Sequence, residues 1–351
     1  MGKKTVQYAI NGGLIFGITN ALLNIIEQIN DENENPVNWS KVIKAGGKGA
    51  LLGAGSGAAL GAIMDSRNNN QELINTSAII ATMFADINLD KDSSVYTQLT
   101  LKADEIIRLI KEKLESKLGA EIIKIGSSED GSALQENFDI DIAIPFNNRS
   151  FSSTQAMIHF LLEFIDNSYD DDDLIEVRMQ KKSIGLLFDL EGDEYKIDLV
   201  PLKLSNSNSK ETVGYLAVNN TSLFGKNSYT KTNISSLKEI KLTPTQIKVL
   251  VILKNWKRNE SIPISSHLLK LLILDAYKSN KNRIPRDLTK KLIMIFSHIS
   301  ENIMFRRITS VENTNNVLTD MSLTNKRKIK KACDKIIEEY NYQPNSIVEY
   351  I

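Results

Sequence analysis

Cysteine is almost absent from this sequence of 351 residues, in which Cys333 is the single example. One thiol excludes an intramolecular disulfide and is typical of a protein that works in the reducing cytosol. A cleavable signal-peptide pattern is lacking too. We therefore expect a cytoplasmic protein.

An excess of charge of either sign is also lacking, because the 43 Lys and Arg residues equal the 43 Asp and Glu residues in number. The chain as a whole is therefore not attracted to nucleic acid or to an anionic membrane. A protein that acts on a long nucleic-acid template would more often be basic, although a local basic channel needs no net charge. The length of 351 residues allows two domains with an appendage.

Two short apolar segments between residues 120 and 145 organise the rest of the chain. The segment 121–125 is apolar and rich in β-branched residues, and Gly126 and Ser127 follow it, which predicts a strand, a turn and a short helix start. Residues 138–144 read FDIDIAI and alternate with the period of a strand. Because successive strand side chains point to opposite faces, Asp139 and Asp141 share one face and the isoleucines take the other.

The two acidic residues of the second segment predict a cation site. Neighbouring carboxylates repel each other unless a cation lies between them. Mg²⁺ prefers oxygen ligands and commonly binds one or two carboxylates together with substrate phosphates. A third carboxylate is expected from a neighbouring strand, and Asp198 interrupts the apolar run 195–201, which loop 191–194 joins to 184–190 in a predicted hairpin. An Asp-x-Asp pair on a strand often occurs by chance, but this combination of features is far rarer.

The stretch GSSEDGSALQENFDIDIAI resembles the signature of the polymerase-β-like nucleotidyltransferases. The resemblance is greatest to the branch that holds cyclic GMP-AMP synthase, oligoadenylate synthase and the bacterial dinucleotide-cyclase-like enzymes. That branch has Gly-Ser, three residues, Gly-Thr, and then Ser-Asp-x-Asp. This chain has Gly126-Ser127, Gly131-Ser132 and Phe138-Asp139-Ile140-Asp141, so that a serine replaces the threonine and a phenylalanine replaces a small residue. The segment YKIDLVP around Asp198 resembles the strand that carries the third metal ligand of the family.

The resemblance implies an α+β fold, with a mixed-sheet nucleotidyltransferase core and a C-terminal helical domain like that of oligoadenylate synthase. We expect the catalytic domain at 91–238 and the helical nucleotide-binding domain at 239–351. An amphipathic helix over 95–118 is expected to pack on the sheet. Residues 1–90 have no counterpart in the resemblance and are expected to form a Gly/Ala-rich helical extension of unknown role.

The resemblance also implies which residues bind the nucleotide. The backbone after Gly126 and Ser127 would hold the β- and γ-phosphates. By position, Lys254 on one helix and Ser266 on the next would contact the incoming triphosphate, with Lys257 as a rival to Lys254. The alternative for Lys254 is an ordinary solvated lysine. His267 stands where relatives often have an aromatic residue, and its role is left open.

Two Mg²⁺ or Mn²⁺ ions are implied by the same resemblance. Asp139, Asp141 and Asp198 would hold one ion, and Asp139 and Asp141 would hold the second with the triphosphate oxygens. In such sites the two ions lie about 3.5–4 Å apart and clamp an in-line displacement.

Residues 6–64 leave two alternatives open. Val6–Ile26 holds no charged residue, and 45–64 is dense in glycine and alanine. Small residues at this density let helices approach closely, as in membrane helix pairs. Polar residues in the first segment and Lys48 in the second favour tightly packed soluble helices over a membrane hairpin.

The function expected from the sequence is synthesis of a cyclic or linear oligonucleotide signal from NTPs or dNTPs in bacterial antiphage defence. One alternative is template-independent synthesis of a short DNA or RNA oligomer, as in Hailong-type defence enzymes. A second is NMP transfer to a protein or tRNA, as in nucleotidyltransferase toxins. A third is a membrane-associated module regulated by its nucleotidyltransferase domain. A downstream effector protein and a homo-oligomer are partners that the sequence leaves open.

Overall fold

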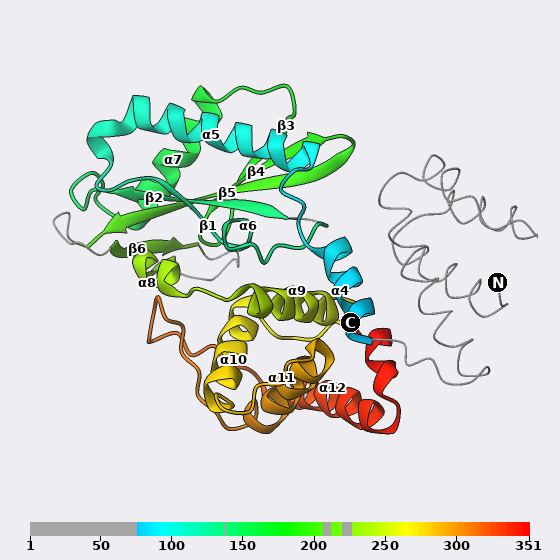
Figure 1. Cartoon of the computed structure of the whole chain (residues 1–351). Helices are drawn as coiled ribbons and strands as arrows, with labels where there is room; N and C mark the ends of the chain where they lie inside the picture. The colour runs from blue at the N-terminus through cyan, green and yellow to red at the C-terminus, as the bar shows by residue number, and fades with distance from the viewer. Residues whose placement is uncertain (1–75, 137, 206–211, 220–226) are drawn as a thin grey trace, which may run out of the picture.

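The computed structural model describes residues 76–136, 138–205, 212–219 and 227–351 (Figure 1). The helices are α4 (Thr76–Ile87), α5 (Ser94–Leu114), α6 (Ser127–Asp130), α7 (Thr154–Ser168), α8 (Ile234–Glu239), α9 (Pro244–Asn259), α10 (Ser266–Ser279), α11 (Leu288–Asn302) and α12 (Leu323–Tyr342), with 3₁₀ turns η1 (Glu115–Lys117) and η2 (Pro344–Glu349). The strands are β1 (Ile123–Ile125), β2 (Asp139–Phe146), β3 (Leu174–Met179), β4 (Ile184–Leu190), β5 (Asp193–Leu204), β6 (Val213–Val218) and β7 (Ser228–Asn233).

The strands form one seven-stranded sheet with the order β1-β2-β5-β4-β3, to which β6 adds beside β5 and β7 beside β6. Strands β2 and β5 run parallel, whereas the other neighbours are antiparallel. The sheet is therefore mixed, and with its helices it confirms the expected α+β class. We call residues 88–239 the sheet unit, and residues 76–87 with 240–351 the helical unit.

Helices α5 and α7 cover one face of the sheet, and the helical unit lies on the side of the other face (Figure 1). The buried residues of α5 recur at helical spacing, as the amphipathic pattern predicts: Leu99, Ala103, Ile106, Ile110 and Leu114. On β2, Ile140, Ile142 and Ile144 are at most 1% exposed and pack in the same core. The alternation along β2 therefore turns its two aspartates toward the opposite face.

The hairpin expected from residues 184–201 is formed by β4 and β5. Its turn consists of Glu191 and Gly192, with φ angles of 59° and 90°. Glycine adopts a positive φ at no steric cost, so it suits this turn. The hairpin carries Asp198 into the centre of the sheet, next to β2.

The helical unit has its own apolar core, in which Trp256 of α9 packs edge-on against Phe296 of α11 with ring centroids 5.0 Å apart. Helix α9 begins at Pro244, where the N-cap residue Thr243 and the third helical residue Gln246 form a reciprocal capping box. A cap of this kind contributes about 1 kcal/mol to helix stability. Helix α10 begins at Ser266, with Ser265 as its N-cap.

Helix α4 belongs to the helical unit, since Ile80 is fully buried in that core. We expected this stretch in the N-terminal extension, because an isolated apolar helix does not reveal which core will bury it. Residues 1–75 of the expected extension lie outside the described residues, and so do the segments for which a membrane hairpin is one alternative. None of the helices in the described ranges has both the length and the apolar character that crossing a bilayer requires.

Candidate active site

Three carboxylates converge where β2 and β5 lie side by side. The parallel register pairs Asp141 directly with Asp198, and Asp139 lies two residues earlier on the same face of β2. Each of the three residues offers a carboxylate oxygen, and these oxygens all lie within 4.8 Å of one another. The structure thus brings together the three acidic residues that the sequence analysis selected, although the paired Asp141 and Asp198 are 57 residues apart in the chain.

The electrostatics of this cluster favour a cation. Burial, together with the neighbouring charges of Asp139 and Asp198, raises the pKa of Asp141 to about 7. Burial also raises the pKa of Asp198, which is 8% exposed. No hydrogen bond or ion pair from the described part of the chain reaches the Asp141 carboxylate. The cluster thus offers three carboxylates with oxygens close together, and the Asp141 carboxylate has no hydrogen-bond donor among the described residues. Oxygen ligands of this kind are the ones that Mg²⁺ and Mn²⁺ prefer.

Lys196 partly balances the charge of the cluster. Its Nζ lies 3.3 Å from Oδ2 of Asp198 and 3.8 Å from Oδ2 of Asp139. The sequence analysis missed this residue, although Lys196 and Asp198 stand two positions apart on one strand and therefore share a face. Because one ammonium serves several carboxylates, the cluster keeps an excess of negative charge.

Gly126 brings the start of α6 against the Asp141 carboxylate. Its φ of 88° and ψ of −163° lie in a region that is essentially restricted to glycine. A Cβ at this position would lie 2.2 Å from Oδ2 of Asp141. Ser127 and Ser128 follow, and the Oγ of Ser128 is buried with no hydrogen-bond partner in the described residues. The Gly-Ser turn of the sequence therefore lies directly beside the carboxylate cluster.

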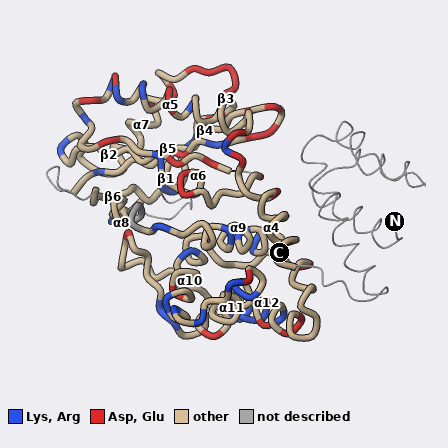
Figure 2. Tube along the Cα trace, in the orientation of Figure 1, with Lys and Arg blue, Asp and Glu red and all other residues tan. Residues whose placement is uncertain are grey.

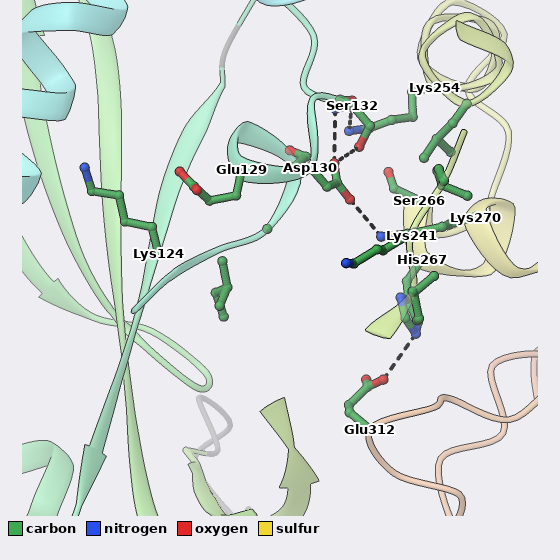
Figure 3. A pocket seen from close by; sticks show the side chains of 16 residues that line it. Lys124, Glu129, Asp130, Ser132, Lys241, Lys254, Ser266, His267, Lys270 and Glu312 are labelled. Atoms are coloured by element: carbon green, nitrogen blue, oxygen red, sulfur yellow. Dashed lines mark hydrogen bonds and ion pairs between the residues drawn. The ribbon is translucent and has the colours of Figure 1, made fainter. Parts of the chain in front are cut away.

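A cleft of about 760 Å³ opens beside this turn, between the sheet unit and the helical unit (Figure 3). The sheet unit contributes Lys124, Ile125, Gly126, Ser127, Glu129, Asp130 and Ser132, and the segments beyond it contribute Ile240, Lys241, Leu242, Leu250, Lys254, Ser266, His267, Lys270 and Glu312. All four residues that the sequence proposes for nucleotide binding, Gly126, Ser127, Lys254 and Ser266, line this one cleft. Their contact with a nucleotide remains a prediction.

The two rival lysines of α9 occupy different places. Lys254 is 9% exposed, lines the cleft and donates a 2.6 Å hydrogen bond from Nζ to the backbone oxygen of Ser132. Burial lowers the pKa of Lys254 to about 8. Lys257 instead donates to Ser266 Oγ at 3.2 Å and to a backbone oxygen near the end of the α9–α10 loop. Lys254 is thus the lysine that faces the cleft, and Lys257 supports the start of α10.

Further charges of the cleft were missed by the sequence analysis. Lys270 of α10 forms a 2.7 Å ion pair with Asp130, at the end of α6. Lys270 lies four residues after Ser266, and this helical spacing places both on one face, so the pattern could have identified it. Together with the Lys254–Ser132 bond, this pair ties the Gly-Ser loop to the helical unit across the cleft (Figure 3).

His267 joins a polar contact at the far end of the cleft. Its Nε2 lies 3.3 Å from Oε2 of Glu312 and 3.2 Å from Oγ of Ser310. Burial opposes ionisation of Glu312, but the nearby polar side chains of His267 and Ser310 outweigh it and lower the pKa of Glu312 to about 2. The Glu312 loop also reaches the sheet unit, since its backbone oxygen accepts a hydrogen bond from Asn233 at 2.9 Å. This loop therefore links both units at the cleft.

Solved structures with this fold include two bacterial CD-NTases. CdnC of E. coli MS115-1, solved with ATP, is 18% identical and has a TM-score of 0.60 over 79% of this chain and 96% of that chain. CdnG of Bradyrhizobium diazoefficiens, solved with GTP, is 14% identical and has a TM-score of 0.62 over 79% of this chain and 94% of that chain. The Cid1 poly(U) polymerase, solved with Mg and 3′-dATP, is 13% identical and has a TM-score of 0.53 over 78% and 98%.

These likenesses show that the chain has the fold of the CD-NTases, and they confirm the expected polymerase-β-like core with a C-terminal helical part. No protein-family model and no curated protein matches the chain. At identities of 13–18% the likeness establishes the fold, so a statement on activity must rest on the residues of the site.

Proposed function

We propose that this protein is a metal-dependent nucleotidyltransferase that joins NTPs or dNTPs and releases pyrophosphate. The observation that carries the proposal is the convergence of Asp139, Asp141 and Asp198 within 4.8 Å, beside a cleft lined with lysines. Carboxylates that hold divalent ions next to a phosphate-binding cleft are what nucleotidyl transfer needs, because the reaction depends on positioning and on charge stabilisation.

The carboxylates would hold two Mg²⁺ or Mn²⁺ ions, with all three acids on one ion and with Asp139 and Asp141 on the other. When bound, the two ions lower the pKa of the attacking hydroxyl and offset the charge of the leaving pyrophosphate. Strands β2 and β5 fix the acids through their parallel register, so that the ligand set is formed before substrate arrives. Because Lys196 offsets only part of the negative charge, the cluster stays negative, which favours the binding of divalent ions.

The triphosphate would lie along the cleft between the Gly-Ser turn and α9. The backbone N–H groups after Gly126 and Ser127, which line the cleft, would donate to the β- and γ-phosphates. Lys254 adds a positive charge from the opposite wall, and Ser266 adds a hydroxyl. The proposal thus assigns catalysis to a domain at 91–238 and triphosphate binding partly to a helical domain at 239–351, to which α4 adds.

The proposed product is a short oligonucleotide signal, cyclic or linear, made in bacterial antiphage defence in the cytoplasm. This part of the proposal is supported by the fold shared with CdnC and CdnG over 79% of the chain. A downstream effector protein that binds the product, and self-association of the enzyme, are partners consistent with this role.

A second candidate is template-independent extension of a DNA or RNA oligomer. The likeness to the Cid1 poly(U) polymerase, which covers 98% of that chain, favours it. In that case the acceptor is the end of an existing strand, and the products form a ladder of increasing length. The two candidates share the carboxylate site and differ in the acceptor.

The direct test is incubation of the purified full-length protein with each labelled NTP and dNTP and with Mg²⁺ or Mn²⁺, followed by mass spectrometry of the products. We expect pyrophosphate release and a product of a few nucleotides. A ladder that needs an added oligonucleotide primer would favour the second candidate. Modification of an added protein or tRNA would support the toxin alternative instead, and absence of nucleotide turnover under every condition would contradict the proposal.

A further inference from the structure

We propose that Gln180 is a positioning residue that fixes Asp198, the third carboxylate of the proposed metal site. Gln180 follows the end of β3, and its Nε2 donates a 2.9 Å hydrogen bond to Oδ1 of Asp198. The inference rests on the proposed function, because it assigns Gln180 a role in the same site. The sequence gives no signal for it, since Gln180 is a single polar residue in the turn between two strands.

The orientation of the Gln180 amide is determined by its two partners. An ionised carboxylate is purely an acceptor, so Nε2 and not Oε1 must face Asp198. On the other side of the amide, Oε1 accepts a hydrogen bond from Oγ of Ser183 at 3.0 Å. Both ends of the amide are therefore satisfied, and rotation of the side chain would break two hydrogen bonds.

The backbone around Gln180 is also held in place. Its N–H donates to the backbone oxygen of Ser183 at 2.8 Å, which closes the β3–β4 turn. Its own backbone oxygen accepts a 2.9 Å hydrogen bond from Nδ2 of Asn219, just beyond β6. The amide is thus attached to a turn that is anchored from two sides, which makes it a rigid support.

Gly185 provides the space for this contact. It pairs directly with Asp198 between β4 and β5. A Cβ on Gly185 would lie 2.2 Å from Nε2 of Gln180 and 3.3 Å from Oδ1 of Asp198. The Gln180 amide therefore occupies the space beside Gly185 that the side chain of any other residue would fill. Strand pairing alone does not require a glycine at this position.

The consequence for the site concerns which oxygen of Asp198 is free. Gln180 binds Oδ1, whereas Oδ2 lies 3.3 Å from Lys196 Nζ, which is itself 3.8 Å from Oδ2 of Asp139, so Oδ2 is the oxygen left for the cluster. Without the amide, Asp198 could turn about its side-chain bonds and present either oxygen or neither. Groups that orient metal ligands in this way typically change metal affinity or activity 10- to 100-fold when they are removed.

Three variants of the full-length protein test this role: Gln180→Ala, Gly185→Ala and the double variant. Mn²⁺ affinity is measured by electron paramagnetic resonance without nucleotide, and kcat and KM for the NTP are measured separately. Gln180→Ala should weaken Mn²⁺ binding about 10- to 100-fold and lower kcat, with KM for the NTP within about twofold of wild type. Gly185→Ala should act in the same direction because its Cβ displaces the amide, and the double variant should be no worse than Gln180→Ala.

Gln155→Ala is the matched control, because the Gln155 amide also joins two elements of the sheet unit, through a 3.0 Å bond to the backbone oxygen of Ser228. It should leave Mn²⁺ affinity unchanged. Wild-type Mn²⁺ affinity in both single variants, or strictly additive losses in the double variant, would overturn the positioning role while leaving the proposed function intact. If the wild-type protein itself binds no Mn²⁺, the proposed metal site fails together with this inference.

Discussion

The two units of the molecule carry opposite net charge. Residues 88–239 of the sheet unit contain 26 Asp and Glu against 17 Lys and Arg, whereas residues 240–351 of the helical unit contain 20 Lys and Arg against 10 Asp and Glu. Figure 2 shows red segments around α5 and β3 and blue segments along α9 to α12. The balance of the whole chain therefore conceals two units of opposite sign that meet at one cleft.

This contrast extends into the site itself. The acidic groups stand on neighbouring strands, where the β2–β5 register fixes their separation. The basic groups Lys254 and Lys270 stand on helices and reach the loop after α6 with long side chains. Strands thus supply a rigid ligand set for small cations, and helices supply charges that can follow a larger and more mobile triphosphate. The following four predictions test this division.

The largest effect is expected from the double variant Asp139→Asn/Asp141→Asn. A divalent ion at a reacting phosphate supplies several kcal/mol of charge stabilisation, so turnover should fall on the order of 1,000-fold or more. The melting temperature should stay the same or rise, because repulsion within the cluster is relieved. Asp166→Asn, an exposed carboxylate on α7, is the control and should keep full activity. Normal turnover in the double variant would refute the assignment.

A pair of glycine variants separates backbone strain from contact with the acids. Gly126 and Gly192 have similar φ angles of 88° and 90°, but a Cβ on Gly192 would meet nothing within 4 Å. Both Gly→Ala changes should lower the free energy of unfolding by about 1–3 kcal/mol. Gly126→Ala alone should also abolish Mn²⁺ binding and turnover, because its Cβ displaces the Asp141 carboxylate. Equal activity of the two variants, measured by NTP turnover, would show that this close approach is unimportant.

The helical side of the comparison is tested by Lys254→Met. Loss of a charge-assisted contact of about 1.5–3 kcal/mol should weaken ATP binding about 10- to 100-fold, as measured by calorimetry with Mn²⁺ affinity unchanged. Lys248→Met is the control on the same helix, since Lys248 lies over the ring of Phe84 and not in the cleft. Equal ATP affinity in the two variants would remove Lys254 from the site.

The smallest expected effect is a pH dependence of ATP binding. Burial lowers the pKa of Lys254 to about 8. The amine of Lys254 is therefore mostly charged below that pH and mostly neutral above it. Affinity for ATP should therefore be full near pH 7 and fall up to about tenfold by pH 9. In Lys254→Met this part of the pH dependence should vanish. A wild-type profile that is flat across this range would mean that the Lys254 charge does not contribute to binding.

The fold and the carboxylate cluster were predictable because their signals are local and periodic. The alternation of 138–144 predicted a strand with its aspartates on one face, and a lone acid in an apolar run predicted the partner strand. The apolar spacing of Leu292, Ile295, Phe296 and Ile299 also marks α11, which the sequence analysis did not assign. Strand β7, by contrast, reads SYTKTN and is strand only because β6 pairs with it, so no local pattern reveals it.

Tertiary contacts between side chains were the part that the sequence could not supply. Lys270 and Asp130 are 140 residues apart, and their pairing depends on how the helical unit sits against the sheet unit. The support of Asp198 by Gln180 likewise depends on the β4–β5 register, which places Gly185 beneath the amide. Side chains of ordinary type acquire such roles from tertiary packing, and a single sequence does not record that packing.

An anomalous-scattering map of crystals grown with Mn²⁺ and ATP would locate the metal ions and the nucleotide together. We expect manganese peaks among the oxygens of Asp139, Asp141 and Asp198, with the triphosphate between the Gly126–Ser127 turn and Lys254. A map in which Asp198 turns away from the other two acids, with no manganese between them, would contradict this expectation.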